Sequence, residues 1–272
     1  MRIALVLEYD GSRYCGWQSQ LQGCSIQDAL EAALSAIAKE KIRIITAGRT
    51  DSGVHALYQV VHFDTLVQRP LNAWMRGTNA LLPNDIAILW ATEVSDQFHA
   101  RYSALERRYR YLLLNQSTRP GIHHNKVGWY HVPLALEKMQ LASNALIGEH
   151  DFSSFRAAEC QARSPIRTIT HLSITRHGNL FVFELSANGF LQHMVRNIVG
   201  CLIYVGKGKF SPEWMDELLK SCNRSYAAPT FSSAGLYLIH VKYDQMWCMP
   251  EFSEMPFFPA LSLYNQIHSK DC

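Results

Sequence analysis

The segment ITAGRTDSGVHALYQVVHF, residues 45–63, gathers charged and polar side chains on a turn. Arg49, Asp51 and His55 stand among glycine, serine and threonine residues, directly before a run that alternates like a strand. A carboxylate beside an arginine can act as a nucleophile or a base, and a glycine-rich turn can bind phosphate. A carboxylate together with an imidazole can bind a metal ion. The segment is therefore the first candidate for an active site.

The residues around this turn argue against two of these chemistries. A phosphate cradle leads into a helix and carries a lysine, whereas AGRTDSG leads into a strand and has no lysine. A metal site on Asp51 and His55 lacks further ligands at suitable spacing, so we expect no metal. An ordinary Asp-Ser-Gly turn remains an alternative to catalysis. It does not account for Arg49, which can keep Asp51 ionised or pair with an RNA phosphate.

A second candidate group lies in FLQHMVRNIVGCLIYVG, residues 190–206, which has the periodicity of a helix. Its apolar residues form one face, while His193, Arg196, Asn197 and Gly200 share another. This polar stripe is either solvated or turned toward a cleft. In the second case Arg196 becomes a candidate ion-pair partner for Asp51.

Composition and cysteine usage limit the class of protein. The chain has 272 residues, 48% of them hydrophobic, which is enough for one large domain or two. Its seven cysteines include no closely spaced pair, so we expect neither a disulfide framework nor a zinc knuckle, and we expect a cytoplasmic protein. Only five apolar residues precede Glu8, and no apolar run approaches membrane-spanning length. We therefore expect neither a signal peptide nor contact with a membrane.

Positive charge is concentrated in two segments, although the formal net charge is only +3. Residues 98–131 carry six lysines or arginines against one acid, with tyrosines and a tryptophan between them. Residues 156–176 carry four arginines against Glu159. Cations mixed with aromatic rings suit a surface that follows a nucleic-acid backbone and stacks bases. The alternative is a pair of solvated strand edges.

The hydrophobic pattern predicts the same order of elements twice. In the first half, strands at 2–9, 42–45, 57–63 and 86–93 alternate with helices opened by Ser25 and Asp28 and around 71–81. In the second half, strands at 108–114, 166–176, 180–187 and 236–243 alternate with helices at 134–147 and 190–205 and a short helix after Ser211-Pro212. The predicted class is α+β, with two βαββαβ (ferredoxin-like) halves, largely antiparallel sheets and an active-site cleft between them.

Domain boundaries follow from where this periodicity is lost. We predict an N-terminal βαββαβ domain at 1–103 that carries the loop of Asp51, and a C-terminal βαββαβ domain at 104–245. Residues 246–272, rich in proline and aromatic residues, are predicted to form a tail on the surface. The two sheets are expected to pack either edge to edge or face to face.

Ordered motifs over nearly the whole chain add a family resemblance to this interpretation. AGRTDSGVHA, FHARYSA, RRYRYLLLN, DFSSFR, FLQHMVRNIVG and GLYLIHV closely resemble those of the tRNA pseudouridine synthase A family. The resemblance implies isomerisation of uridine to pseudouridine at positions 38, 39 and 40 in the anticodon stem-loop of tRNA. It also implies a homodimer that binds the tRNA anticodon arm and needs no cofactor.

The resemblance also implies roles for individual residues. Asp51 corresponds to the catalytic aspartate, Tyr109 to a base-stacking tyrosine, Arg196 to the arginine that pairs with the aspartate, and Leu236 to an apolar residue of the pocket. A half-buried strand tyrosine remains the alternative for Tyr109, and Tyr111 is expected on the opposite face. The implied RNA contacts are Arg49, Arg69, Phe98, His99, Ala100, Arg101, Tyr102, Gln161 and Arg163.

These residue types fit the implied reaction. The bond between uracil and the ribose must break, the base must rotate, and C5 must bond to C1′ before it loses its proton. Asp51 can attack as a nucleophile or remove a proton from the sugar, and the sequence does not choose between the two.

The main alternative function is a non-catalytic RNA-binding module, because the order of elements in such modules is also βαββαβ. The chain has no RNP1 pattern, however. A glycoside hydrolase would need a second carboxylate, which the sequence does not single out.

Overall fold

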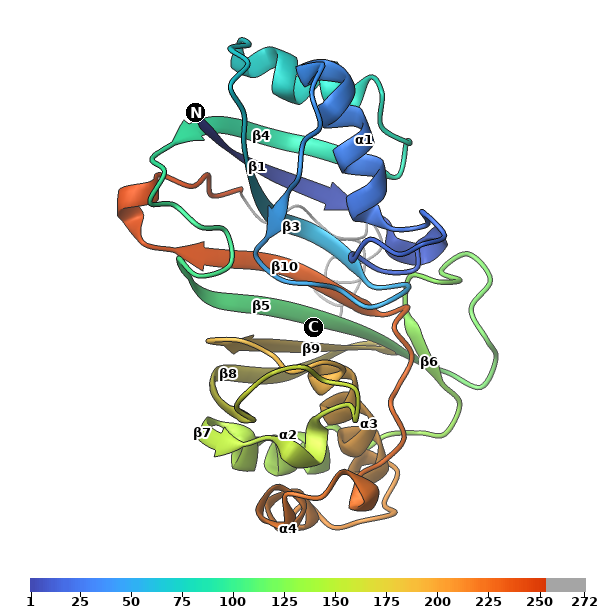
Figure 1. The fold of residues 1–272 in the computed structure, drawn as a ribbon. Coiled ribbons are helices and arrows are strands. Elements are labelled where there is room, and N and C mark those ends of the chain that lie inside the picture. Colours follow the sequence, from blue (N-terminus) through green and yellow to red (C-terminus); the bar gives the residue numbers. More distant parts are fainter. Residues whose placement is uncertain (253–272) are drawn as a thin grey trace, which may run out of the picture.

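Strands dominate the computed structural model, which describes residues 1–252, and they join into one sheet (Figure 1). The order is β4-β1-β3-β10-β5-β9-β8-β7, and the short strands β2 and β6 pair with β3 and β5. The pairs β3–β10 and β5–β6 are parallel, and the other pairs are antiparallel. The predicted α+β class is confirmed. The strands are β1 (Arg2–Tyr9), β2 (Ile45–Thr46), β3 (His55–Asp64), β4 (Ile86–Val94), β5 (Ala104–Asn115), β6 (Gly128–Tyr130), β7 (Gly148–Asp151), β8 (Ile166–His177), β9 (Leu180–Ala187) and β10 (Leu236–Tyr243).

The same strand order occurs in each half of the chain. The first half runs β4-β1-β3-β2, and the second runs β10-β5-β9-β8, so the fourth strand of each half pairs with its first. The two halves meet where β10 pairs with the beginning of β3, at His55 and Ala56. Of the two predicted arrangements, the sheets therefore adopt the edge-to-edge one (Figure 1). The domain boundary after residue 103 stays a prediction.

Four α-helices occur within residues 1–252, and none of them is long and apolar enough to cross a membrane. The first begins after Ser25 as predicted, because Ser25 and Asp28 form a capping box. Its apolar face, from Ile26 to Ala38, is buried in the core. The helices are α1 (Ile26–Ala38), α2 (Leu136–Ser143), α3 (Met194–Gly206) and α4 (Trp214–Ser221).

Several predicted elements are shorter or less regular than the sequence suggested. Residues 42–44 are not in a strand, and the helical segment near 71–81 contains a π-helix, η2 (Ala73–Gly77). The helix expected at 134–147 ends at Ser143 and continues as a 3-10 turn, η3 (Asn144–Leu146). The helix expected from residue 190 begins at Met194, because His193 has a left-handed backbone with φ 63°. Most of the predicted tail lies outside the described residues.

A disulfide bond joins Cys15 to Cys24, which corrects the expectation that the cysteines stay unpaired. They are nine positions apart in the sequence, so their spacing gave no signal. The intervening loop folds back, and the backbone N–H of Cys15 donates a hydrogen bond to Cys24 O. This contact brings the two side chains together next to the start of α1.

Candidate active site

The loop that carries Asp51 is held by the segments on either side of it. The hydroxyls of Tyr9 and Thr50 are hydrogen-bonded at 2.8 Å, and the backbone N–H of Trp17 donates to Thr50 O at 2.9 Å. Within the loop, the N–H of Val54 donates to Asp51 O at 3.1 Å. Tyr9, Trp17 and Val54 are buried, so the backbone of Asp51 is fixed from the core side.

Gly16 allows the neighbouring segment to approach this loop closely. Its φ is +101°, a conformation that side chains disfavour. A Cβ atom at this position would lie 2.8 Å from Thr50 O and 3.0 Å from the carbonyl carbon of Asp51. The close packing behind the loop that carries Asp51 therefore requires glycine at position 16.

The carboxylate of Asp51 is paired with Arg196, which comes from α3 in the other half of the chain. Arg196 donates from Nη1 to Asp51 Oδ2 at 3.0 Å and from Nε to Phe231 O at 2.9 Å. The side chains of Arg196 and Asp51 are 16% and 25% exposed. The pair is thus partly desolvated but remains open to a ligand in the cavity.

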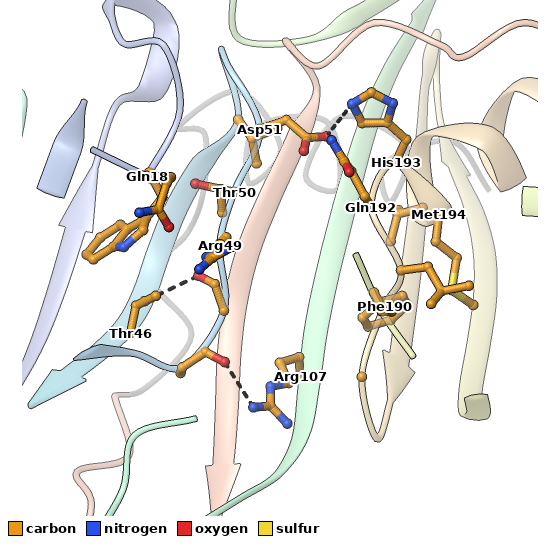
Figure 2. Close-up of a pocket in the computed structure, with 18 of the residues that line it drawn as sticks. Gln18, Thr46, Arg49, Thr50, Asp51, Arg107, Phe190, Gln192, His193 and Met194 are labelled. Carbon is orange, nitrogen blue, oxygen red and sulfur yellow. Dashed lines mark hydrogen bonds and ion pairs between the residues drawn. The ribbon is translucent and has the colours of Figure 1, made fainter. Parts of the chain in front are cut away.

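His193 contacts the same carboxylate oxygen. Its Nε2 lies 3.5 Å from Asp51 Oδ2, and Figure 2 shows its ring beside the carboxylate. No side chain or backbone group within residues 1–252 donates a hydrogen bond to Asp51 Oδ1. Oδ1 is therefore the oxygen that remains available for chemistry.

The remainder of the predicted polar stripe on α3 does not face this site. Asn197 is fully buried and donates to Phe155 O at 2.7 Å. Gly200 packs against Pro229 O, from which a Cβ atom would lie only 2.6 Å away. The stripe is thus divided between the cavity, which Arg196 lines, and the core.

Tyr109 lies on β5 at the wall of the cavity and is only 8% exposed. Its ring makes an edge-to-face contact with Phe190, with the centroids 5.1 Å apart. Burial raises the pKa of Tyr109 above its usual value, and the nearby Tyr9 and Asp51 raise it further. The phenol is therefore neutral at physiological pH, which suits it to stacking rather than to proton removal.

The position of Tyr111 on β5 differs from the one expected from the sequence. Residues two apart on a strand share a face, so Tyr111 lies on the same face as Tyr109 rather than the opposite one. It is fully buried and donates to Ser232 O at 2.8 Å. Leu236, which pairs in register with Tyr111, is 5% exposed and lines the cavity.

A cavity of about 1190 Å³ is lined by Asp51, Tyr109, His193, Arg196 and Leu236, among others (Figure 2). The loop at 46–52 forms one wall, and residues 188–196 form the facing wall. The titratable lining is dominated by positive charge. It includes the carboxylates of Asp51 and Glu159 and five arginines, namely Arg49, Arg101, Arg107, Arg167 and Arg196. A cavity of this charge suits an anionic ligand.

The predicted RNA-contact residues differ in where the structure places them. The side chains of Phe98 and Ala100 are fully buried, so they pack the segment rather than present surface. His99 is half-buried and stacks on the exposed ring of Tyr102 at 4.3 Å. The members that line the cavity are Arg49, Arg101, Tyr102 and Gln161, whereas Arg69 and Arg163 lie outside it.

His55 belongs to the core and not to this site. It is 2% exposed, its Nδ1 lies 3.0 Å from Asp10 Oδ1, and its Nε2 lies 2.9 Å from Asn125 O. Burial lowers the pKa of His55, and the nearby charge of Lys126 lowers it further. Within residues 1–252, no three histidine, cysteine or acidic side chains are grouped as metal ligands would be.

Sequence reasoning missed two residues of the cavity as individual candidates. His193 was recognised only as part of a helical stripe, and Arg107 only as one of many basic residues. The sequence gave little indication that His193 contacts Asp51, because this contact depends on a backbone conformation that no local pattern predicts. Arg107 binds backbone carbonyls of distant segments, which the sequence does not reveal.

Comparisons with known proteins agree with the motifs. A family model described as tRNA pseudouridine synthase matches residues 5–103 and 142–244. Relatives called tRNA pseudouridine synthase A include one from Nitrosomonas europaea, 61% identical over 253 residues that cover 93% of each chain. Another, from Thiobacillus denitrificans, is 55% identical over 254 residues, covering 93% of this chain and 98% of the relative.

Solved structures are less similar to this chain than these relatives are. An H/ACA RNP bound to a substrate RNA containing 2'-deoxyuridine has a chain that is 12% identical, with a TM-score of 0.37, covering 74% of this chain and 44% of that chain. This likeness is too low to carry an argument. The family model and the relatives suffice, because they span most of the chain. The chain therefore belongs to the tRNA pseudouridine synthase family, whose enzymes are isomerases.

Proposed function

We propose that this protein isomerises uridine to pseudouridine at positions 38, 39 and 40 in the anticodon stem-loop of tRNA. Conversion of uridine to pseudouridine in tRNA follows from membership of the family. The three positions rest on the resemblance of the ordered motifs. The observation that carries the proposal is the pairing of Asp51 with Arg196 inside an arginine-lined cavity.

Each side chain at the site has a role in this reaction. Arg196 and His193 bind Oδ2 of Asp51, which leaves Oδ1 to attack the ribose or to remove a proton from it. Both routes use the same oxygen. The target uridine must first leave its stack, at a cost of a few kcal/mol, and stacking on Tyr109 offsets part of this cost. Leu236 completes the apolar part of the pocket.

The surrounding residues support an RNA substrate. Arg49, Arg101, Tyr102 and Gln161 lie at the cavity, where their donors and the exposed tyrosine ring suit contacts to phosphates and bases. Arg69 and Arg163 lie outside it, and we propose them as further contacts to the RNA. We further propose that the protein acts in the cytoplasm as a homodimer bound to the anticodon arm. Light scattering on the purified protein would measure the oligomeric state.

A tritium-release assay tests the reaction. Isomerisation expels the hydrogen from C5, so tRNA labelled at uridine C5 should lose tritium with the wild-type protein and not with Asp51→Asn. Asp216→Asn serves as the control, because Asp216 is an exposed aspartate of α4 that does not line the cavity. Replacing the uridines at 38, 39 and 40 by cytidine should abolish release.

The outcomes separate the alternatives. Equal release by the wild type and Asp51→Asn would move the chemistry away from Asp51. Binding of tRNA without release by the wild-type protein would indicate a non-catalytic RNA-binding protein. Release from the tRNA that lacks uridine at the three positions would contradict the proposed site of modification.

A further inference from the structure

Arg107 lies on β5 and lines the cavity (Figure 2). Its Nη2 donates to Ala47 O at 2.9 Å and to Arg101 O at 2.6 Å. Its Nη1 donates to Ala104 O at 3.0 Å and to Asn188 O at 3.1 Å. One guanidinium therefore connects segments that are distant in the sequence and belong to opposite walls of the cavity.

These segments are the ones that carry the site. Ala47 begins the loop that leads to Asp51, and Asn188 begins the loop that leads to His193. Arg101 belongs to the segment that we propose as an RNA contact. A shift of the guanidinium would thus displace the aspartate, its histidine neighbour and the RNA-binding surface relative to one another.

Arg107 is half-buried, and the hydrogen-bond partners of its guanidinium are backbone carbonyls. Within residues 1–252 no carboxylate forms an ion pair with it, whereas Arg2, Arg110 and Arg196 each have one. Burial lowers the pKa of Arg107, and the nearby positive charge of Arg101 also lowers it. The four carbonyl hydrogen bonds, rather than an ion pair, therefore offset the cost of burying its charge.

We propose that Arg107 is a positioning residue, which holds the Asp51 loop, the 188–193 loop and the RNA-contact segment in register through its four carbonyl contacts. This inference rests on the proposed function and deepens it. A planar guanidinium offers five donors in a fixed fork, and lysine offers three on a flexible stem. Lysine would keep the charge but could not hold all four carbonyls in place.

Three variants of the full chain test the proposal. Arg107→Lys keeps the charge, and Arg107→Met removes both the charge and the donors. Arg108→Met is the matched control, since Arg108 points to the opposite face of β5, where it donates to Ser186 Oγ. The single-turnover rate of pseudouridine formation is measured with enzyme in saturating excess over tRNA, so that weaker binding does not affect the rate.

We expect Arg107→Lys and Arg107→Met to slow single turnover about 10- to 100-fold, as small misplacements of catalytic groups do. Arg108→Met should stay within about twofold of the wild type, because a surface substitution changes little. A wild-type rate for Arg107→Lys would overturn the proposal, since charge alone would then suffice. A wild-type rate for Arg107→Met would overturn it as well.

Amide hydrogen exchange provides a readout that needs no activity. The N–H groups of Ala47 and Asn188 donate to Val60 O and Thr168 O, so they are protected in the folded protein. In Arg107→Met both should exchange about tenfold faster, while the amides of β1 remain unchanged. Unchanged exchange at Ala47 and Asn188 would refute the positioning role. If the wild-type protein formed no pseudouridine, the proposed function would fail, and the exchange would still decide whether Arg107 positions the loops.

Discussion

Arg196 Nη1 donates to Asp51 Oδ2 at 3.0 Å, although the two residues are 145 positions apart in the sequence. The contact joins a loop of the first half to α3 of the second, at the cavity where the two halves meet. It leaves one carboxylate oxygen, Oδ1, free of hydrogen bonds from the described part of the chain. The pair therefore distinguishes the two carboxylate oxygens of Asp51.

Replacing Arg196 by methionine should impair both stability and turnover. The substitution removes hydrogen bonds to a carboxylate and to Phe231 O, and hydrogen bonds to charged groups contribute about 1.5 to 3 kcal/mol. We expect a loss of this order in the free energy of unfolding and a decrease in turnover on the order of 100-fold. Urea denaturation would measure the loss in the free energy of unfolding, and single-turnover kinetics would measure the decrease in turnover. Arg176→Met is the control, since Arg176 lies in an exposed hairpin, and it should change neither stability nor turnover. Wild-type turnover in Arg196→Met would contradict the role of the ion pair.

Substitutions of His193 should separate its backbone role from its side-chain role. Asparagine tolerates the left-handed conformation at φ 63°, whereas valine is strained there by about 1 to 2 kcal/mol. Both remove the imidazole from Asp51, so both should slow turnover by roughly fivefold or more, the equivalent of about 1 kcal/mol. Thermal unfolding should show a further loss for His193→Val only. Wild-type turnover in His193→Asn would show that the contact with Asp51 has no part in the reaction.

Tyr109 should act through its ring. Base stacking on an aromatic side chain contributes about 1 to 3 kcal/mol, so Tyr109→Leu should weaken turnover by roughly 5- to 150-fold. Tyr109→Phe keeps the ring and should remain active.

The pH dependence provides a second test of Tyr109. Its pKa is raised by burial, so its phenol keeps its proton up to and beyond the ordinary tyrosine value of about 10. The pH profile of Tyr109→Phe between about pH 6 and 9 should therefore match the wild type. A basic limb that disappears in Tyr109→Phe would instead show that the hydroxyl takes part in proton transfer.

Glycine at position 16 should be required for the packing behind the loop that carries Asp51. An alanine there would be strained at φ +101° and would place its Cβ 2.8 Å from Thr50 O. We expect Gly16→Ala to lower the free energy of unfolding by about 2 to 4 kcal/mol, from backbone strain and overpacking together. Gly23→Ala is the control, since Gly23 also has a positive φ, of +64°, but has no atom within 4 Å of the added Cβ. Equal losses in the two variants would mean that the close approach to Thr50 is unimportant.

The sequence by itself determined the elements whose signals are local. The capping box of Ser25 and Asp28 set the start of α1, and the alternating residues at 236–243 gave β10 its observed bounds. The class of fold and the duplicated order of strands followed from such patterns. Hydrogen-bond caps and the repeat of apolar residues act within a few positions, so they can be read from the chain.

Only the tertiary structure decided how the site is assembled. It joined the two sheets through β3 and β10, and it brought Arg196 and His193 to one oxygen of Asp51. It also paired Cys15 with Cys24, began α3 at Met194 and placed Arg107 among the carbonyls of several loops. These features depend on packing between residues far apart in the sequence, which no local pattern of hydrophobicity or capping specifies.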